Sequence, residues 1–298
     1  MTSTAPGVGS SFLLPSAGSL PLVMGILNVT PDSFSDGGVH FDRSSAIDAA
    51  LRMEQEGAAI IDVGGESTRP GAEDVPAGEE LERVVPVIEG IRKRSAVRIS
   101  VDTRKAGVAA AAIEAGADIV NDVSALRHDP ELKALVARRG VAVILMHMRG
   151  EPRTMQQDIH FADVVADVIR ELTLWRDEAV AAGIAPDRIL VDPGLGFGKT
   201  LDHNLELLAQ CRQLTPIAPV VIGASRKAFI GKLTGQGGGA ARMPGSLAAV
   251  AAAHRGNAAI VRVHDVRETV DFLKVLTAIE ERAPRNQQPA TNEGGARP

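Results

Sequence analysis

Short apolar runs recur along this chain, and each ends at or next to a polar residue before a segment with helical periodicity. Eight such runs stop at or next to Asn28, Asp62, Asp102, Asn121, His147, Asp192, Ser225 and Arg262. Eight strand–helix units predict an α/β fold, a single closed (β/α)8 TIM barrel of parallel strands whose C-terminal ends meet at one mouth. A packed interior does not need so many hydrogen-bonding groups at one rim, so the pattern predicts a ligand site there.

The apolar pattern predicts strands over residues 22–29, 58–63, 97–101, 118–120, 141–146, 189–191, 220–222 and 258–261. It predicts helices over residues 43–56, 79–94, 105–114 and 130–138, a long one from 161 that ends at Gly183, one over 201–214, one that begins at 226 and one over 266–276. Asp129 is expected to cap the fourth helix, with Pro130 at its first position. A doubly wound open sheet is the alternative, but its chemistry usually gathers at one switch point, whereas here polar residues end nearly every strand.

The length of 298 residues is typical of one barrel domain. We expect a flexible arm over residues 1–20, the barrel over 21–282 and a disordered tail over 283–298, which is rich in Pro, Asn, Gln and Gly. The chain has no Tyr and one Trp. The core must therefore consist mainly of Val, Ile, Leu and Ala, which suits parallel strands buried on both faces.

Composition also argues against several classes of partner. The net charge is −5 and no basic stripe is visible, so nucleic acid is not expected as a partner. No apolar run reaches the ~18 residues of a membrane span, and the N-terminus does not resemble a signal peptide. The single cysteine, Cys211, has helical spacing from Leu208 and Leu214, so we expect a small buried side chain and no intrachain disulfide; a reducing compartment is allowed.

Two predicted strand–helix connections are unusually long. Residues 30–38 follow the first strand and residues 64–71 follow the second, and both carry Gly, Pro and polar side chains. They are candidates for lids that exclude water from a bound substrate, with ordinary surface loops as the alternative. The Gly-rich segment over residues 192–200 is not a phosphate loop, because Pro193 stands where that motif needs glycine. It is interpreted as a strand-end Asp followed by a turn that lets the backbone approach a flat ligand.

Three strand-end residues, Asp102, Asn121 and Asp192, belong to the same half of the predicted ring. Carboxylates and an amide can bind the edge of a planar heterocycle, because Asp accepts two parallel N–H bonds in a fork geometry. Lys227 could donate to a ring carbonyl or nitrogen. The alternative for each Asp alone is an N-cap of the following helix.

Arg262 and His264 alternate with Val263 and point the same way if the strand continues. Two cationic or potentially cationic groups at a barrel rim beside a helix N-terminus predict an anion site. Asn28 could complete this site or hold a metal through its amide oxygen. The alternative to an anion site is that Arg262 and His264 form ordinary salt bridges at the surface. The histidines lack zinc-site spacing, so an ion would be Mg²⁺ held mainly by substrate phosphates. Glu66, Asp32 and Asp36 are further oxygen donors in the long connections, although solvated charge explains them as well.

Several motifs together resemble those of the dihydropteroate synthase family. They are residues 24–38, 62–71, 102–104, 121–123, 146–148, 192–194, 225–227 and 262–266, and the resemblance covers about residues 20–282 in order. It implies condensation of 6-hydroxymethyl-7,8-dihydropterin diphosphate with p-aminobenzoate in folate biosynthesis. It further implies Mg²⁺, inhibition by sulfonamides, a cytoplasmic location and a homodimer.

The resemblance also implies a role for each matching position. Pterin-binding residues would be Asp102, Asn121, Asp192 and Lys227, with Met146 and Phe197 near the ring faces and Gly223 in the substrate site. The diphosphate and Mg²⁺ would be held by Asn28, Arg262 and His264, and the p-aminobenzoate site would be shaped by Phe34, Thr68, Arg69, Pro70 and Ser225. The catalytic residues would be Asp102, Lys227, Arg262 and His264. A pterin-binding methyltransferase barrel and a non-catalytic pterin- or phosphate-binding protein are the alternatives.

Overall fold

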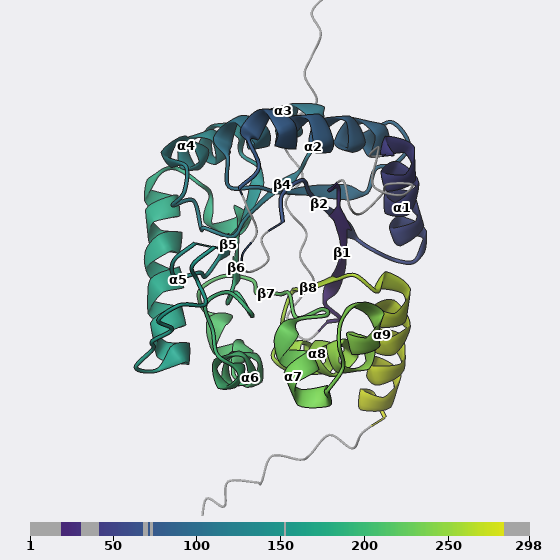
Figure 1. Cartoon of the computed structure of the whole chain (residues 1–298), viewed down its shortest axis with the longest axis vertical. Coiled ribbons are helices and arrows are strands. Elements are labelled where there is room, and N and C mark those ends of the chain that lie inside the picture. Colours follow the sequence, from purple (N-terminus) through teal and green to yellow (C-terminus); the bar gives the residue numbers. More distant parts are fainter. Residues whose placement is uncertain (1–18, 31–41, 68–70, 72–73, 152, 283–298) are drawn as a thin grey trace, which may run out of the picture.

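Parallel strands form the centre of the molecule and helices surround them (Figure 1). The structure is a computed structural model that describes residues 19–30, 42–67, 71, 74–151 and 153–282. Within this part of the chain the strands are β1 (Leu22–Asn28), β2 (Ile60–Gly64), β3 (Arg98–Asp102), β4 (Ile119–Asp122), β5 (Ala142–Met146), β6 (Ile189–Asp192), β7 (Val221–Ile222) and β8 (Ile260–Val263).

The strands follow one another around the ring in the order β6-β5-β4-β3-β2-β1-β8-β7. A parallel bridge between Val191 and Val220 joins the two ends of this sheet. The predicted barrel is therefore confirmed, and the open doubly wound sheet is excluded. The expected arm and tail lie outside the described residues, apart from Ser19 and Leu20.

The helices alternate with the strands and cover the outside of the ring (Figure 1). They are α1 (Arg43–Gln55), α2 (Ala77–Arg92), α3 (Ala106–Ala115), α4 (Pro130–Arg139), α5 (Val164–Ala181), α6 (Leu201–Ala209), α7 (Ala228–Thr234), α8 (Met243–Arg255) and α9 (Val266–Glu280), with 3-10 turns η1 (Pro186–Arg188), η2 (Cys211–Leu214) and η3 (Gly239–Arg242). The expected cap of α4 is confirmed: the Asp129 carboxylate accepts the Glu131 N–H at 3.0 Å. Cys211 is fully buried, as expected.

Some predicted helix boundaries were wrong. The α5 helix begins only after its N-cap Asp163, so Phe161 precedes it. The α6 helix stops at Ala209, and the chain continues as the η2 turn. The helix expected from Arg226 begins at Ala228, because Arg226 has a left-handed φ of 57°. The separate α8 helix was not predicted.

Alternate side chains along each strand point into the barrel. One interior layer is apolar and consists of Met24, Ile60, Ile119, Ala142, Ile144, Leu190, Val221 and Ile260. Two residues further along the same strands, or just beyond their ends, the interior positions are Asp62, Asn121, Met146, Asp192, Gly223 and Arg262. On β2, β4, β6 and β8 the interior therefore changes from apolar to hydrogen-bonding side chains within one two-residue step.

Candidate active site

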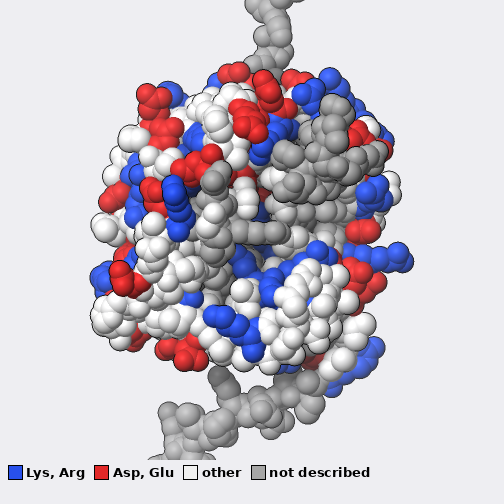
Figure 2. Space-filling model, viewed as in Figure 1, with Lys and Arg blue, Asp and Glu red and all other residues white. Residues whose placement is uncertain are grey.

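A pocket opens at the C-terminal mouth of the barrel. It is lined by Asp102, Asn121, Val123, Met146, Asp192, Leu195, Phe197, Gly223, Lys227 and Arg262. All the residues predicted to hold a planar ring lie in this wall, together with Gly223 and Arg262. Figure 2 shows Lys and Arg side chains around the hollowed centre of the face that it presents.

Arg262 lies at the base of an ion-pair network inside the barrel. Its Nε donates to Asp62 Oδ2 at 2.6 Å, and its Nη2 donates to Asp102 Oδ2 at 2.7 Å. Asn121 Nδ2 donates to the same Asp62 oxygen at 3.1 Å. Asp62 was predicted to lie at a strand end and had no predicted role, whereas in the structure it is the fully buried acceptor that links β2, β4 and β8.

Burial raises the pKa of both strand-end aspartates. The pKa of Asp102 rises to about 7, although the positive charge of Arg262 opposes the rise. Burial also raises the pKa of Asp192, while the Gly194 N–H, which donates to its Oδ1 at 2.7 Å, and the charge of Lys227 act in the other direction. A buried carboxylate gains from added N–H donors, so the edge of a ring that carries them would be bound well.

The pocket also has an apolar face. Phe197 lies under the ammonium of Lys227, whose Nζ is 4.3 Å from the ring centroid. Met146 and Phe197 belong to a small buried cluster with Val123, Met148 and Met155. A flat ring could therefore contact apolar atoms on its face while polar groups bind its edge.

Next to this pocket, Ser225 contacts His264 twice. Its Oγ accepts the His264 backbone N–H at 3.2 Å and lies 3.0 Å from the ring Nδ1. Burial, followed by the charges of Arg226 and Arg262, lowers the pKa of His264 to about 4. The ring is therefore neutral at pH 7. If the serine hydroxyl donates to Nδ1, the ring proton is on Nε2, and His264 offers an anion an N–H donor and no charge.

The remaining predicted residues are only partly within the described structure. Asn28 ends β1, and its backbone is paired in register with Gly64 of β2. Phe34, Thr68, Arg69 and Pro70 lie outside the described residues, as do Asp32 and Asp36. Beside residues 68–70, Glu66 accepts the Val75 N–H at 2.9 Å and a 2.9 Å bond from Lys105 Nζ, so both sides of this segment are tied to the barrel.

Three residues without a predicted role form a hydrogen-bonded chain behind the pocket: the half-buried Glu171 and the buried His147 and Lys199. His147 was noted at a strand end and Lys199 in the Gly-rich turn. The available signal was their position next to β5 and β6, but lysine is ordinarily exposed, so its burial could not be read from the pattern.

The chain is similar in sequence to enzymes that bind pterins. The family model described as pterin binding enzyme matches residues 24–264. The dihydropteroate synthase of Escherichia coli K12 is 48% identical over 261 residues, which are 87% of this chain and 92% of that protein. The enzyme of Mycobacterium leprae is 47% identical over 265 residues, with 86% and 92% covered.

The chain is also similar to solved structures of dihydropteroate synthases. Xanthomonas albilineans dihydropteroate synthase with 4-aminobenzoic acid has a TM-score of 0.83 and 48% identity, and the match covers 88% of this chain and 94% of that one. The same enzyme in complex with 7,8-dihydropteroate has a TM-score of 0.80 and 45% identity, covering 89% and 95%. The fold therefore places the chain in a class of (β/α)8-barrel enzymes. The chain belongs to the pterin-binding enzyme family and, within it, to the dihydropteroate synthases, which are transferases.

Proposed function

We propose that the chain joins 6-hydroxymethyl-7,8-dihydropterin diphosphate and p-aminobenzoate to give 7,8-dihydropteroate and diphosphate in folate biosynthesis. The observation that carries this proposal is the single pocket in which Asp102, Asn121 and Asp192 lie beside Lys227 and Arg262. Its support is the identity with dihydropteroate synthases and the relatives solved with 4-aminobenzoic acid and with 7,8-dihydropteroate.

The pterin would lie with its edge on the strand-end residues. Asp192 and Asp102 would accept ring N–H groups, while Asn121 and Lys227 would donate to the ring carbonyl and nitrogen. Met146 and Phe197 would contact the ring faces. The bicycle would then occupy the β3–β6 side of the mouth, with its methylene group directed toward Arg262.

The diphosphate would lie on the β8 and β1 side of the mouth. Arg262 and the N–H of neutral His264 would donate to its oxygens. Mg²⁺ fits this side only as a substrate-held ion: among the described residues no group of three or more His, Cys, Asp or Glu side chains could hold it, and the Asn28 amide oxygen would be one protein ligand. Bound Mg²⁺ would supply positive charge to the diphosphate.

In the reaction the amine nitrogen of p-aminobenzoate forms a bond to the methylene carbon, the C–O bond to diphosphate breaks, and the nitrogen loses one proton. An aromatic amine is a weak nucleophile, so departure of diphosphate would lead. Arg262 and His264 would stabilise the growing negative charge, and Asp102 and Asp192 would favour positive charge on the pterin methylene. No protein nucleophile is required.

The p-aminobenzoate side would involve Ser225 with Phe34, Thr68, Arg69 and Pro70. The connections that carry the last four residues would shield the methylene from water. A Yersinia pestis dihydropteroate synthase with a sulfonamide drug complex is 44% identical with a TM-score of 0.84, the match covering 90% of this chain and all of that one, which supports sulfonamide inhibition of this chain.

We also infer a cytoplasmic homodimer. The lone cysteine is free and buried, which suits a reducing compartment. Leu205 on α6 and Leu233 on α7 are exposed and could meet a second copy. In the described part of the chain, no helix is both long enough and apolar enough to cross a membrane. Light scattering across protein concentrations tests the dimer.

The decisive assay follows formation of 7,8-dihydropteroate and release of diphosphate. The expected result is release that requires both p-aminobenzoate and Mg²⁺, with inhibition by a sulfonamide that more p-aminobenzoate relieves. Binding of the pterin without turnover would favour the non-catalytic alternative. Transfer from a methylated folate would favour the methyltransferase alternative.

A further inference from the structure

Lys199 is buried behind the loop that forms one wall of the pterin pocket. Its side chain follows the Gly-rich residues 194–198 between β6 and α6 and is 4% exposed. Its Nζ donates to the carbonyl oxygens of Phe197 at 3.0 Å and His147 at 3.3 Å, and lies 3.1 Å from His147 Nδ1. An ammonium group has three N–H donors, and each has an acceptor here.

His147 is held so that it can accept from this ammonium. The ring is fully buried and stacks on Trp175 with centroids 5.3 Å apart. Its Nε2 lies 3.0 Å from Glu171 Oε2. Because an ionised carboxylate only accepts, Nε2 carries the proton and the Nδ1 lone pair faces Lys199. Burial, and next the charge of Lys199, lower the pKa of His147 to about 4, so the ring is neutral at pH 7.

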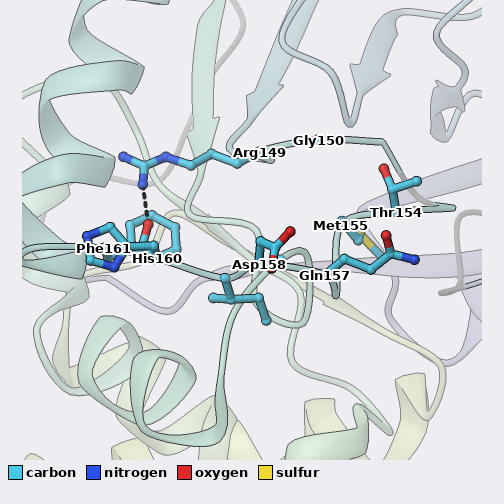
Figure 3. Close-up of a pocket in the computed structure, with 10 residues that line it drawn as sticks. Arg149, Gly150, Thr154, Met155, Gln157, Asp158, His160 and Phe161 are labelled. Atoms are coloured by element: carbon cyan, nitrogen blue, oxygen red, sulfur yellow. Dashed lines mark hydrogen bonds between the residues drawn. The ribbon is translucent and has the colours of Figure 1, made fainter.

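The Glu171 end of the Lys199–His147–Glu171 hydrogen-bonded chain is fixed as well. Burial opposes ionisation of Glu171, but hydrogen bonds from His147 and Arg149 outweigh it and lower the pKa of Glu171 to about 2. The Arg149 guanidinium lies 4.1 Å over the Phe161 ring and donates to the His160 carbonyl (Figure 3). Hydrogen bonds are therefore donated in one direction, from Lys199 to His147 and from His147 to Glu171 on α5.

The loop in front of Lys199 borders a cavity at its Gly198 end and packs closely against His147 at its Gly194 end. A cavity of about 280 Å³, lined in part by Met155, Gly198 and Phe161, lies against it (Figure 3). At Gly194, whose φ is 69°, an added Cβ would lie 1.9 Å from the His147 carbonyl oxygen, so the loop backbone presses on the end of β5. The loop backbone is also held at Gly196, whose N–H donates to Asn204 Oδ1 at 2.6 Å and whose carbonyl accepts from Gln156 Nε2 at 3.0 Å.

Movement of this loop would alter two walls of the pocket together. Asp192 precedes the loop, and its carbonyl accepts the His147 N–H at 2.8 Å. Phe197, whose carbonyl is bonded to Lys199, lies under Lys227 in the pocket. Burial lowers the pKa of Lys199 to about 7, and the charge of Asp192 is the foremost influence that opposes this, so the two groups are also coupled electrostatically.

We propose that Lys199 is a positioning residue for pterin binding: through His147 and Glu171 it fixes the loop that places Asp192 and Phe197 around the ring. The inference rests on the proposed function, which assigns this pocket to the pterin. It concerns a side chain that does not line the pocket and does not touch the reacting atoms.

The test compares four variants of the full chain. Lys199→Met removes the ammonium at similar length, and exposed Lys93→Met is its matched control. His147→Asn keeps an acceptor near the Nδ1 position, whereas His147→Leu, of similar shape, removes it. Calorimetry measures affinity for free 6-hydroxymethyl-7,8-dihydropterin, kinetics give kcat and the KM of each substrate, and a thermal melt reports folding.

We expect Lys199→Met and His147→Leu to weaken pterin binding by ~10-fold or more, the loss of one or two charge-assisted bonds. Lys93→Met and His147→Asn should stay within ~3-fold of the wild type, with the KM of p-aminobenzoate little changed throughout. Unchanged pterin affinity in folded Lys199→Met overturns the inference, as does a parallel loss of affinity for both substrates and of thermal stability. Failure of the proposed function would appear separately, as a wild type that forms no 7,8-dihydropteroate from the two substrates.

Discussion

The two interior layers of the barrel come from the same strands but have opposite physical character. Leu190 packs in the apolar layer, while Asp192, two residues later on β6, lies in the pocket wall. On β8 the same step leads from Ile260 to Arg262. The lower layer stabilises the ring by excluding water, whereas the upper layer holds polar groups whose burial is unfavourable unless a partner side chain, as in the Arg262–Asp62 pair, or a ligand binds them. On β6 and β8, a residue that stabilises the fold and a residue that lines the pocket therefore lie two positions apart.

The largest effect should follow from breaking the network that joins β2, β4 and β8 within the upper layer. Asp62→Ala removes the acceptor shared by Arg262 and Asn121, and loss of one partner of a buried ion pair costs about 3–5 kcal/mol. Urea unfolding should show this loss in the free energy of unfolding. Ser100→Ala is the matched control, because Ser100 is paired in register with Asp62 and no described residue bonds to its Oγ. Equal costs for both variants would show that the network adds nothing.

A smaller effect should separate the two ends of the pocket. Arg262→Met keeps side-chain length and removes the charge expected to bind diphosphate, which is worth about 1.5–3 kcal/mol for a charge-assisted bond. Binding of the pterin diphosphate should weaken by more than binding of the free pterin, as calorimetry with both ligands would show. Free pterin should also lose some affinity, because Arg262 supports Asp102. Equal losses would mean that Arg262 acts only through the aspartates.

The upper layer could be predicted only in part from sequence. Asp102, Asn121 and Asp192 were found because strand periodicity and strand ends are local properties. The bond between Arg262 and Asp62 joins residues 200 positions apart, and it arises only when the ring closes. Arg262 was therefore expected as an open cation at the rim, and His264, which burial leaves neutral, as a possible second one. The buried ammonium of Lys199 was likewise invisible, because nothing local distinguishes it from an exposed lysine.

A further effect concerns the pH dependence of stability. Burial lowers the pKa of His147 from its ordinary value of 6.5 to about 4 in the folded chain, so the ring stays neutral down to about pH 4. Between these values the unfolded chain binds a proton that the folded chain does not, so this group lowers the free energy of unfolding as pH falls, by up to ~1.4 kcal/mol per pH unit. Asp102 acts oppositely, since its folded pKa is raised to about 7.

Comparison with His147→Asn isolates the histidine contribution. Between pH 4.5 and 6 the unfolding free energy of the wild type should fall more steeply with acid than that of the variant, by roughly one proton in slope. Urea unfolding at several pH values measures both slopes. Parallel curves would indicate that His147 is already protonated in the folded state.

The central claim is the separation of stability from binding along one strand, and Leu190→Ala against Asp192→Asn tests it most directly. Unfolding free energy and affinity for 6-hydroxymethyl-7,8-dihydropterin are measured for both variants. Leu190→Ala should lose about 2–5 kcal/mol of stability with little change in affinity. Asp192→Asn should keep its stability, since burial disfavours the charge, and bind pterin ~10- to 100-fold more weakly. Loss of stability and affinity together in both variants would contradict the account.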